Sequence, residues 1–253
     1  LTIPTMLVSV EKHQYKSGVK KAHSLVSETF DSMKIDIEHI YKNYNNSNVE
    51  PDAFRKAYAR YYGLRNAGYA SDHYNNMYHP LNEREASVNA ALYNGGGFQA
   101  RNGMEVLIGK VNKPVATETS TALVISIDID GPKKGKNQLG LDIFAFEVMP
   151  SDNILPMGAK NTEEDKTSFD AKEYCRTPYS DNDLNGIACT FAAVNQAEYM
   201  DDVVATSDPT GCGPKQYKDS ETGECQCSNG KIKRQYVSLK EEMCCLFLLI
   251  NYL

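Results

Sequence analysis

Four oxygen-bearing side chains gather in one short stretch of the chain. Asp128, Asp130, Asn137 and Asp142 fall within fifteen residues, between two segments rich in β-branched and aromatic residues. Carboxylate and amide oxygens are the ligands that Ca²⁺ prefers in proteins. The stretch therefore predicts a loop between neighbouring strands, and a Ca²⁺ site is one interpretation of that loop.

A second interpretation gives the same residues an architectural role. The spacing departs from the EF-hand, because Gly131 stands at its fourth position and Leu139 occupies its twelfth. Asp and Asn side chains also cap turns, and glycine adopts the left-handed backbone that tight turns need. Lys133, Lys134 and Lys136 partly neutralise the acids from within the loop. A cation site and a tight turn are both consistent with these residues.

The seven cysteines all lie from Cys175 onward, in a region rich in Gly, Asn and Ser. This clustering favours disulfides and an oxidising, extracytoplasmic location. Cys175 and Cys189 form the first candidate pair, whose bond would close a loop of about 15 residues. Cys212, Cys225 and Cys227 are interpreted as further disulfide partners, because no C-x-x-C pair of the kind found in zinc sites is present. The odd count leaves at least one thiol unpaired or paired between chains.

No arrangement of residues predicts catalysis, so the chain is not expected to be an enzyme. There is no G-x-S-x-G nucleophile elbow and no H-E-x-x-H metal motif. We expect His13, His23 and His39 to face solvent on a helix, and His73 and His79 to lie in a polar segment without a third metal ligand. No cofactor other than Ca²⁺ is suggested.

Composition narrows the choice of partners. Asp and Glu number 33 against 27 Lys and Arg, for a net charge of −6, which argues against a nucleic-acid partner. The chain has no Trp but 16 Tyr. The Tyr- and Asn-rich segment 58–94 is either a polar region with partly buried rings or a dedicated binding face.

The elements expected around these residues begin with a long amphipathic helix over 5–42. Its apolar residues recur at steps of three and four: Val19, Ala22, Val26, Phe30, Met33, Ile37 and Ile40. Shorter helices are predicted over 51–64 and 82–94. Strands are predicted over 104–108, 123–129 and 143–148, with a short last strand near 151–158, in an antiparallel sheet with one buried face.

These elements predict an α+β fold in which a long N-terminal helix covers a small antiparallel sheet. We expect one domain over 1–203, with the helix in 1–42 and the sheet region in 98–195. The composition then shifts to Gly, Pro, Ser, Thr and Cys. Residues 204–253 are therefore predicted to form a Cys-rich extension that depends on disulfides for stability.

Several strings in this order resemble the type IV pilin and type II secretion pseudopilin family. LTIPTM followed by the Lys-rich KSGVKKAHSLVSETF is similar to the end of the hydrophobic segment of prepilin-type proteins. NGMEVLIG and LVISIDIDGPKKGKNQLGLDIFAFEV resemble the strand pair and Asp/Asn/Gly loop of that group, and LPMG and NGIACT resemble the segments after that loop. The likeness covers residues 1–195. The leader-peptidase site and most of the apolar anchor are missing, so the chain is expected to begin inside the N-terminal helix.

The resemblance implies a structural function: subunits whose N-terminal helices pack into a filament. The assembly residues it implies are Pro4, Leu7, Val19, Val26 and Phe30, and Pro4 would kink a longer helix or sit in a first turn. The implied partners are other pilin subunits and the assembly machinery, with an inner-membrane anchor upstream and an extracytoplasmic location. The resemblance also favours the Cys175–Cys189 disulfide, and some secretion pseudopilins carry Ca²⁺ in a comparable loop.

Two other function classes stay open. One is a free extracellular binding or adhesion module that uses the Tyr-rich segment or the Cys-rich tail. The other is a secreted hydrolase.

Overall fold

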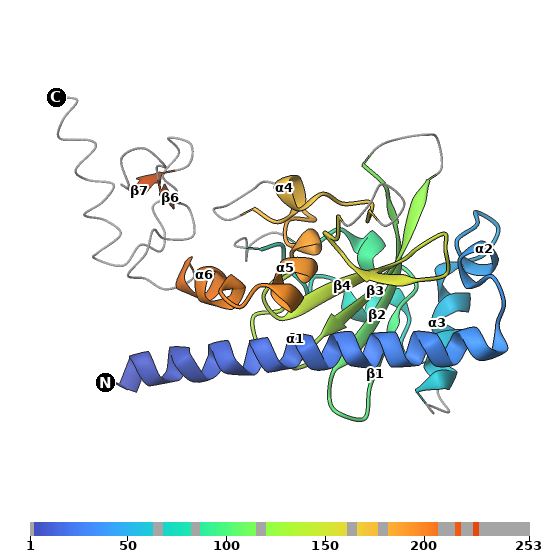
Figure 1. Cartoon of the computed structure of the whole chain (residues 1–253), viewed down its shortest axis with the longest axis horizontal. Helices are drawn as coiled ribbons and strands as arrows, with labels where there is room; N and C mark the ends of the chain where they lie inside the picture. Colours follow the sequence, from blue (N-terminus) through green and yellow to red (C-terminus); the bar gives the residue numbers. More distant parts are fainter. Residues whose placement is uncertain are drawn as a thin grey trace.

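The computed structural model describes residues 3–62, 68–81, 87–114, 120–160, 166–176, 182–206, 216–218 and 225–227. One long helix, α1 (Ile3–Asp36), runs along one face of a five-stranded antiparallel sheet (Figure 1). The predicted α+β class, with a long N-terminal helix on an antiparallel sheet, is therefore confirmed.

Helix α1 is amphipathic, because most of its described apolar residues fall on one face. That face is buried against the sheet over five turns, through Tyr15, Val19, Ala22, Val26, Phe30 and Met33. Gly18 lies on the same side, where an added Cβ would come 2.6 Å from Ile129 Cδ1. The glycine therefore allows the helix backbone to lie close to the end of the sheet.

The prediction that one helix continues to residue 42 is wrong. Helix α1 ends at Asp36, and a separate short helix, α2 (Ile40–Tyr44), begins after His39, whose backbone is left-handed at φ 57°. The Asp152 carboxylate accepts a hydrogen bond of 2.7 Å from the Tyr41 N–H. This contact from a distant turn satisfies an N–H at the start of a new helix, which periodicity along the helix could not reveal.

The sheet has the strand order β1-β2-β3-β4-β5, and every neighbouring pair is antiparallel. The strands are β1 (Gly97–Gln99), β2 (Glu105–Asn112), β3 (Thr121–Asp128), β4 (Ile143–Val148) and β5 (Ile154–Pro156). The three predicted strands and the short last strand are confirmed, although β2 continues four residues past its predicted end. Strand β1 was not predicted.

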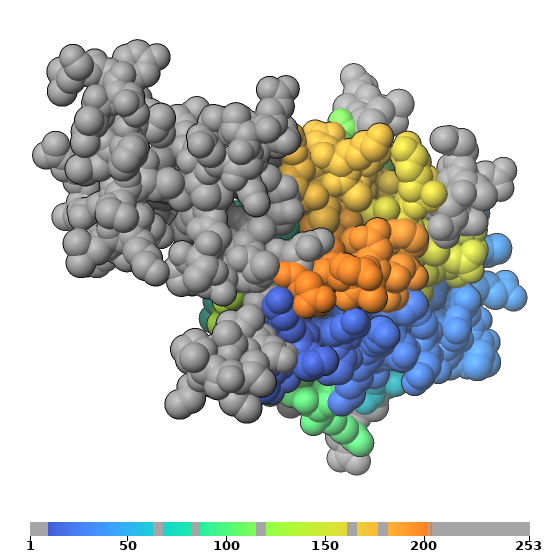
Figure 2. All heavy atoms as spheres, turned by 60° about the vertical axis from the view of Figure 1, so that its left-hand side comes forward, coloured from blue at the N-terminus to red at the C-terminus, as the bar shows by residue number. Residues whose placement is uncertain are grey.

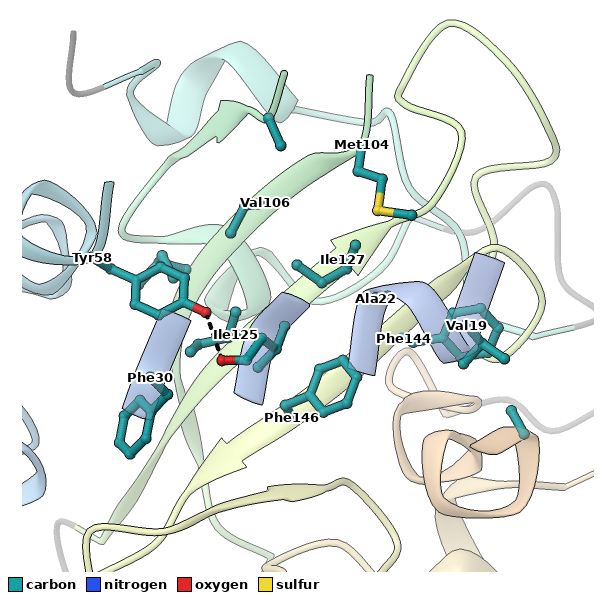
Figure 3. Packing of buried hydrophobic residues seen from close by; sticks show 14 of the residues in the cluster. Val19, Ala22, Phe30, Tyr58, Met104, Val106, Ile125, Ile127, Phe144 and Phe146 are labelled. Atoms are coloured by element: carbon teal, nitrogen blue, oxygen red, sulfur yellow. Dashed lines mark hydrogen bonds between the residues drawn. The ribbon is translucent and has the colours of Figure 1, made fainter. Parts of the chain in front are cut away.

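Strand β3 alternates as predicted, but both of its faces are buried, so the expectation of one buried face is wrong. Ile125 and Ile127 point toward α1 and its residues Val19, Ala22 and Phe30 (Figure 3), and Leu123 belongs to the same buried cluster. The opposite face is covered by Tyr74, Tyr78 and Tyr93 and by later residues of the chain: Phe169, Tyr174, Leu184, Ile187 and Ala188. Most rings of the Tyr-rich segment are therefore core residues.

The remaining helices are short. They are α3 (Pro51–Tyr61), η1 (Ser71–Tyr74), η2 (Ala90–Tyr93), α4 (Ala171–Tyr174), η3 (Ile187–Cys189), α5 (Thr190–Asn195) and α6 (Tyr199–Thr206). The helix predicted over 82–94 is a 3₁₀ turn, η2, in its described part, and residues 82–86 lie outside the described ranges. Figure 2 shows the orange α5–α6 segment lying directly on α1.

The predicted boundary after residue 203 falls within α6, which continues to Thr206. Beyond it, β6 (Gln216–Lys218) and β7 (Cys225–Cys227) pair as an antiparallel ribbon. The rest of the predicted extension lies outside the described residues, so the division into two parts stays a prediction.

Candidate functional site

The loop between β3 and β4, residues 128–142, brings the predicted acidic residues together; we call it the acid loop. Asp128 is the last residue of β3, and Asp142 directly precedes β4. The Ile129 N–H bonds to the Asp142 carbonyl at 3.0 Å, which closes the base of the loop. Both Asp side chains are fully buried. The fold therefore brings Asp128 and Asp142, which are separated in the sequence, close together.

Backbone amides hold the Asp142 carboxylate on both oxygens. Oδ2 accepts hydrogen bonds from the N–H groups of Lys136 (2.6 Å) and Asn137 (2.8 Å), and Oδ1 accepts one from Gln138 (2.6 Å). Three such bonds to one carboxylate fix the path of the loop around it. This part of the acid loop fits the architectural interpretation.

Asp128 organises the first turn of the loop in a similar way, but only with one oxygen. Its Oδ1 accepts hydrogen bonds from the N–H groups of Gly131 (2.9 Å) and Asp130 (3.3 Å). Its Oδ2 is buried and has no hydrogen-bond partner. A buried, unpartnered carboxylate oxygen is costly, so its presence calls for a proton or a cation nearby.

Two further buried oxygens in the same loop have no hydrogen-bond partner. They are Asp130 Oδ1 and Asn137 Oδ1. The Asn137 amide is oriented by its Nδ2, which donates to the Pro132 carbonyl at 3.0 Å, and its backbone is left-handed at φ 53°. Gly135 folds over the acids, because a Cβ there would come 2.4 Å from Asp142 Oδ2 and 2.5 Å from Asp130 Oδ2.

Burial opposes the ionisation of all three loop acids. Burial raises the pKa of Asp142 to about 6, although its three N–H partners act in the opposite direction. Burial, followed by the charges of Asp142 and Asp130, raises the pKa of Asp128 well above its usual range. Burial also raises the pKa of Asp130, while its contact with Asp128 lowers it. Negative charge in the loop therefore needs compensation.

The three unpartnered oxygens match a hard cation in their chemistry. Asp128 Oδ2, Asp130 Oδ1 and Asn137 Oδ1 are the oxygen types that bind Ca²⁺, which takes six to eight oxygen ligands. In the part of the chain that the structure describes, no three His, Cys, Asp or Glu side chains form a ready metal-binding group. A cation there would thus use the Asn137 amide and water beside the carboxylates.

Helix α1 packs against the acid loop. Lys136 Nζ lies 3.6 Å from Glu11 Oε1, and the Tyr15 hydroxyl donates a 3.0 Å hydrogen bond to the same oxygen. Tyr15 is 6% exposed. Asp142 and Asp130 are among the charges that raise its pKa, after burial. The phenol therefore lies in the field of the loop acids.

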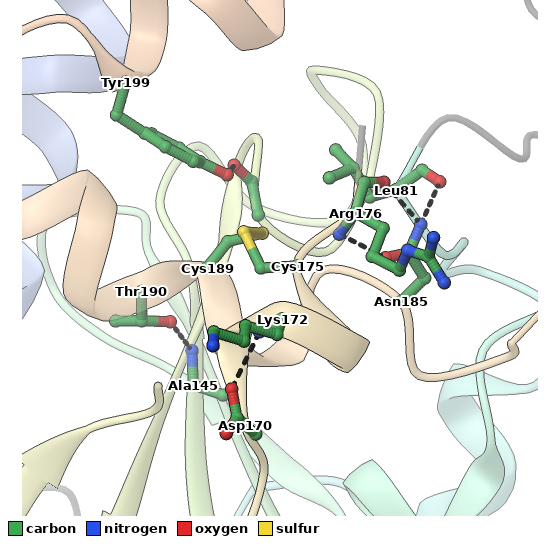
Figure 4. Close-up of a disulfide and its surroundings, with 11 residues drawn as sticks. Leu81, Ala145, Asp170, Lys172, Cys175, Arg176, Asn185, Cys189, Thr190 and Tyr199 are labelled. Atoms are coloured by element: carbon green, nitrogen blue, oxygen red, sulfur yellow. Dashed lines mark hydrogen bonds between the residues drawn. A yellow bond between two sulfur atoms is a disulfide. The ribbon is translucent and has the colours of Figure 1, made fainter. Parts of the chain in front are cut away.

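The predicted Cys175–Cys189 disulfide is present and supports the far end of the acid loop (Figure 4). A Cβ on Gly140 would come 3.1 Å from Cys189 Sγ, and the Tyr199 hydroxyl donates a 2.6 Å hydrogen bond to the Gly140 carbonyl. The disulfide and α6 thus contact the loop at Gly140.

The other predicted site residues lie elsewhere. Val19, Val26 and Phe30 are fully buried in the core of their own chain, so their side chains hold α1 to the sheet, and a role in assembly stays a prediction. The side chains of Pro4 and Leu7 lie outside those that the structure describes. The same applies to Cys212 and to the side chains of Cys225 and Cys227.

The histidines are spread over the fold. The His13 side chain is exposed, and that of His39 is 72% exposed on the turn after α1. His23 was expected to face solvent but is half-buried, because its ring stacks on Phe146 with 5.9 Å between centroids. His73 stacks on Tyr69 at 4.2 Å. The His79 carbonyl accepts a hydrogen bond from the Leu139 N–H, so the backbone at His79 borders the acid loop.

Sequence reasoning missed Glu11, Tyr15 and Gly135 as parts of the site. The pair Glu11 and Tyr15 is spaced i, i+4 on the same helix face as Gly18, a pattern that marks a polar contact on an otherwise apolar face. That spacing shows that Glu11 and Tyr15 share one side of α1, but it does not show that this side contacts the acid loop.

Comparison with protein-family models, with curated proteins and with solved structures gave no match. Among the helices that the structure describes, none is both long and apolar enough to cross a membrane. The fold class and the acid loop therefore carry the functional argument.

Proposed function

We propose that the chain is a structural subunit of a bacterial type IV pilus or type II secretion pseudopilus, which assembles through helix α1. The observation that carries the proposal is the placement of α1: it lies along one face of an antiparallel sheet, and its N-terminal end runs past the sheet (Figure 1). A helix that is buried on one side and extends beyond its own domain has a side left over for neighbouring subunits.

The free side of α1 is the surface we assign to assembly. Val10 and Ile35 are 52% and 85% exposed, near opposite ends of the helix. Between them the exposed positions are polar, including Lys20, Lys21 and Asp31. Subunit contacts through this side would leave the core residues Val26 and Phe30 undisturbed.

The test is to identify the N-terminus of the protein isolated from its native cells and to locate the protein by immunogold electron microscopy. We expect a short basic leader cleaved before about 15–20 apolar residues that continue α1, together with gold-labelled filaments. A secretory signal cleaved after small residues, with the protein found as a free monomer, would contradict the proposal and favour the binding module.

The binding module is the second candidate, and the described Tyr residues give it little support. Tyr74, Tyr78 and Tyr93 are at most 3% exposed. Tyr69 is the exposed tyrosine of that region in the described ranges: it is 48% exposed, and its ring stacks on His73. A binding function would therefore rest on the Cys-rich tail.

We further propose that the acid loop holds Ca²⁺ as a structural cation of the subunit. The support is the set of buried, unpartnered oxygens on Asp128, Asp130 and Asn137. Bound Ca²⁺ supplies positive charge without chemistry of its own, and the lysines of the loop do not reach these buried oxygens as hydrogen-bond donors. The Asp142 carboxylate, held by three amides, shapes the loop around the cation.

A further inference from the structure

The acid loop is in contact with one particular half of helix α1. Lys136 Nζ of the loop lies 3.6 Å from Glu11 Oε1 of the helix. The hydroxyl of Tyr15, on the same helix, donates a 3.0 Å hydrogen bond to that oxygen. One turn farther along, Gly18 lies against Ile129, the loop residue that comes directly after β3. The loop thus contacts α1 within residues 11–18, two turns of the helix, through one ion pair and one apolar contact.

This half of α1 also makes polar contacts with α6 and with the residues just before it. Lys12 Nζ lies 3.3 Å from Asp201 of α6, and Lys16 Nζ donates a 3.0 Å hydrogen bond to the Ala197 carbonyl. Exposed ion pairs of this kind each contribute little. The C-terminal half of α1 is held by apolar side chains such as Val26 and Phe30, which are fully buried. The N-terminal half buries Tyr15 and Val19 in the same core. It is also the half of α1 that makes charged contacts with the acid loop and α6.

The charge balance at this contact depends on what the loop contains. Glu11 is acidic and faces a loop whose own carboxylates are crowded, and Lys136 is its only ion-pair partner in the described part of the chain. The negative charges of Glu11 and Asp130 oppose each other, and this repulsion weakens both contacts of Glu11. A divalent cation among these acids removes that repulsion.

We propose that binding of a divalent cation to the acid loop controls how firmly the N-terminal half of α1 is held on the sheet, with Glu11 and Tyr15 transmitting the state of the loop. The inference rests on the Ca²⁺ site proposed above. It adds a consequence for the helix that is assigned to assembly: the cation sets the order of its N-terminal half and leaves the C-terminal half unchanged.

Hydrogen exchange measured by mass spectrometry tests this on the full chain, in CaCl₂ or in EGTA at constant pH and ionic strength. We expect Ca²⁺ to slow exchange at residues 10–18 by about tenfold and at residues 26–36 by less than about twofold. Calorimetric titration with CaCl₂ on the same samples measures binding separately.

Glu11→Gln and Tyr15→Phe break the transmission without touching the loop oxygens. Each should retain Ca²⁺ affinity within about threefold and lose most of the Ca²⁺-dependent protection of residues 10–18. Glu28→Gln, an exposed position on the same helix, is the matched control and should behave like the natural chain.

The outcomes separate the two proposals. Ca²⁺ binding with protection confined to residues 128–142 would overturn the control of α1 and leave the Ca²⁺ site standing. An absence of Ca²⁺ binding up to millimolar concentration would overturn both. Unchanged protection in both Glu11→Gln and Tyr15→Phe would also overturn the role of these two residues.

Discussion

The Asp142 side chain shows how one residue can determine the path of a loop. Three successive N–H groups, from Lys136 to Gln138, converge on its two oxygens. The loop is thereby wrapped around a buried carboxylate, and Asp128 and Asp130 are brought into the same small volume. The turn interpretation and the cation interpretation are therefore compatible, because the residue that builds the turn also crowds the acids.

The first residue-scale prediction concerns Ca²⁺ and stability. Ca²⁺ at 100 times its dissociation constant should stabilise the folded chain by about 2.7 kcal/mol, which corresponds to a rise of about 5–10 °C in melting temperature for a domain of this size. Differential scanning calorimetry in CaCl₂ and in EGTA measures the shift.

Asp130→Asn should remove most of that shift, because it deletes one carboxylate of the site. Asp31→Asn, at an exposed position on α1, is the matched control and should preserve it. Equal melting temperatures of the natural chain in CaCl₂ and EGTA would count against a Ca²⁺ site.

A second prediction concerns Glu105, a buried acid on β2 whose Oε1 accepts a 2.5 Å hydrogen bond from the Tyr74 hydroxyl. Burial raises its pKa, despite this hydrogen bond. The folded state therefore binds the Glu105 proton more tightly than the unfolded state does. Its contribution to stability is fully present below the unfolded pKa of about 4.3 and is lost as the pH rises through the folded pKa.

Glu105→Gln, which carries no titrating proton and keeps an acceptor for Tyr74, should thus gain stability relative to the natural chain between pH 4 and pH 7. Urea unfolding at the two pH values measures this difference. Glu28→Gln should show no such trend, and a Glu105→Gln difference that is independent of pH would refute the assignment.

At the scale of elements, the docking of α1 depends on a close approach to the start of the acid loop. Gly18 provides that approach, since any Cβ at this position meets the Ile129 side chain. The glycine lowers helix propensity by about 1 kcal/mol relative to Ala, so its place in the helix interior is explained by packing. The position of α1 on the sheet is therefore set by the close contact that Gly18 allows with Ile129.

Gly18→Val should destabilise the fold by about 2 kcal/mol, because a branched side chain forces α1 away from Ile129. Ser17→Val introduces the same side chain at an exposed neighbouring position and should change stability by less than about 0.5 kcal/mol. Urea unfolding compares the two variants. Similar losses in both would show that helix propensity, and not the contact with Ile129, is responsible.

At the scale of the whole molecule, the sheet separates two hydrophobic cores. One contains α1, and the other contains tyrosines of the Tyr-rich segment together with later residues such as Phe169 and Ile187. Cys175 packs against both cores, and Cys189 is buried beside the acid loop. The disulfide between them therefore ties the cover of the second core to the side of the molecule that carries α1.

Replacing both Cys175 and Cys189 by Ala should reduce stability by about 3 kcal/mol, since the lost bond closes a loop of about 15 residues. Urea unfolding under non-reducing conditions measures the loss. In a reducing agent the natural chain and the double variant should converge. A loss below about 1 kcal/mol would mean that packing alone holds this segment.

The sequence determined much of the architecture on its own. The alternation in β3 and the three- and four-residue steps in α1 predict their type and facing, because a side chain's direction is set by the local backbone period. The sequence also placed the four loop residues and the disulfide pair correctly, since β3 and β4 are adjacent along the chain and the two cysteines are only 14 residues apart. Short-range patterns were sufficient wherever the partners were close in sequence.

Only the tertiary structure decided the features that depend on distant partners. Asp152 accepts a hydrogen bond at the start of α2, the Tyr-rich segment buries the second face of the sheet, and Glu11 of α1 pairs with Lys136 of the acid loop. Each of these contacts joins residues far apart in the chain. Burial and electrostatic fields depend on distance in space and not on spacing in sequence, so no local pattern could have predicted them.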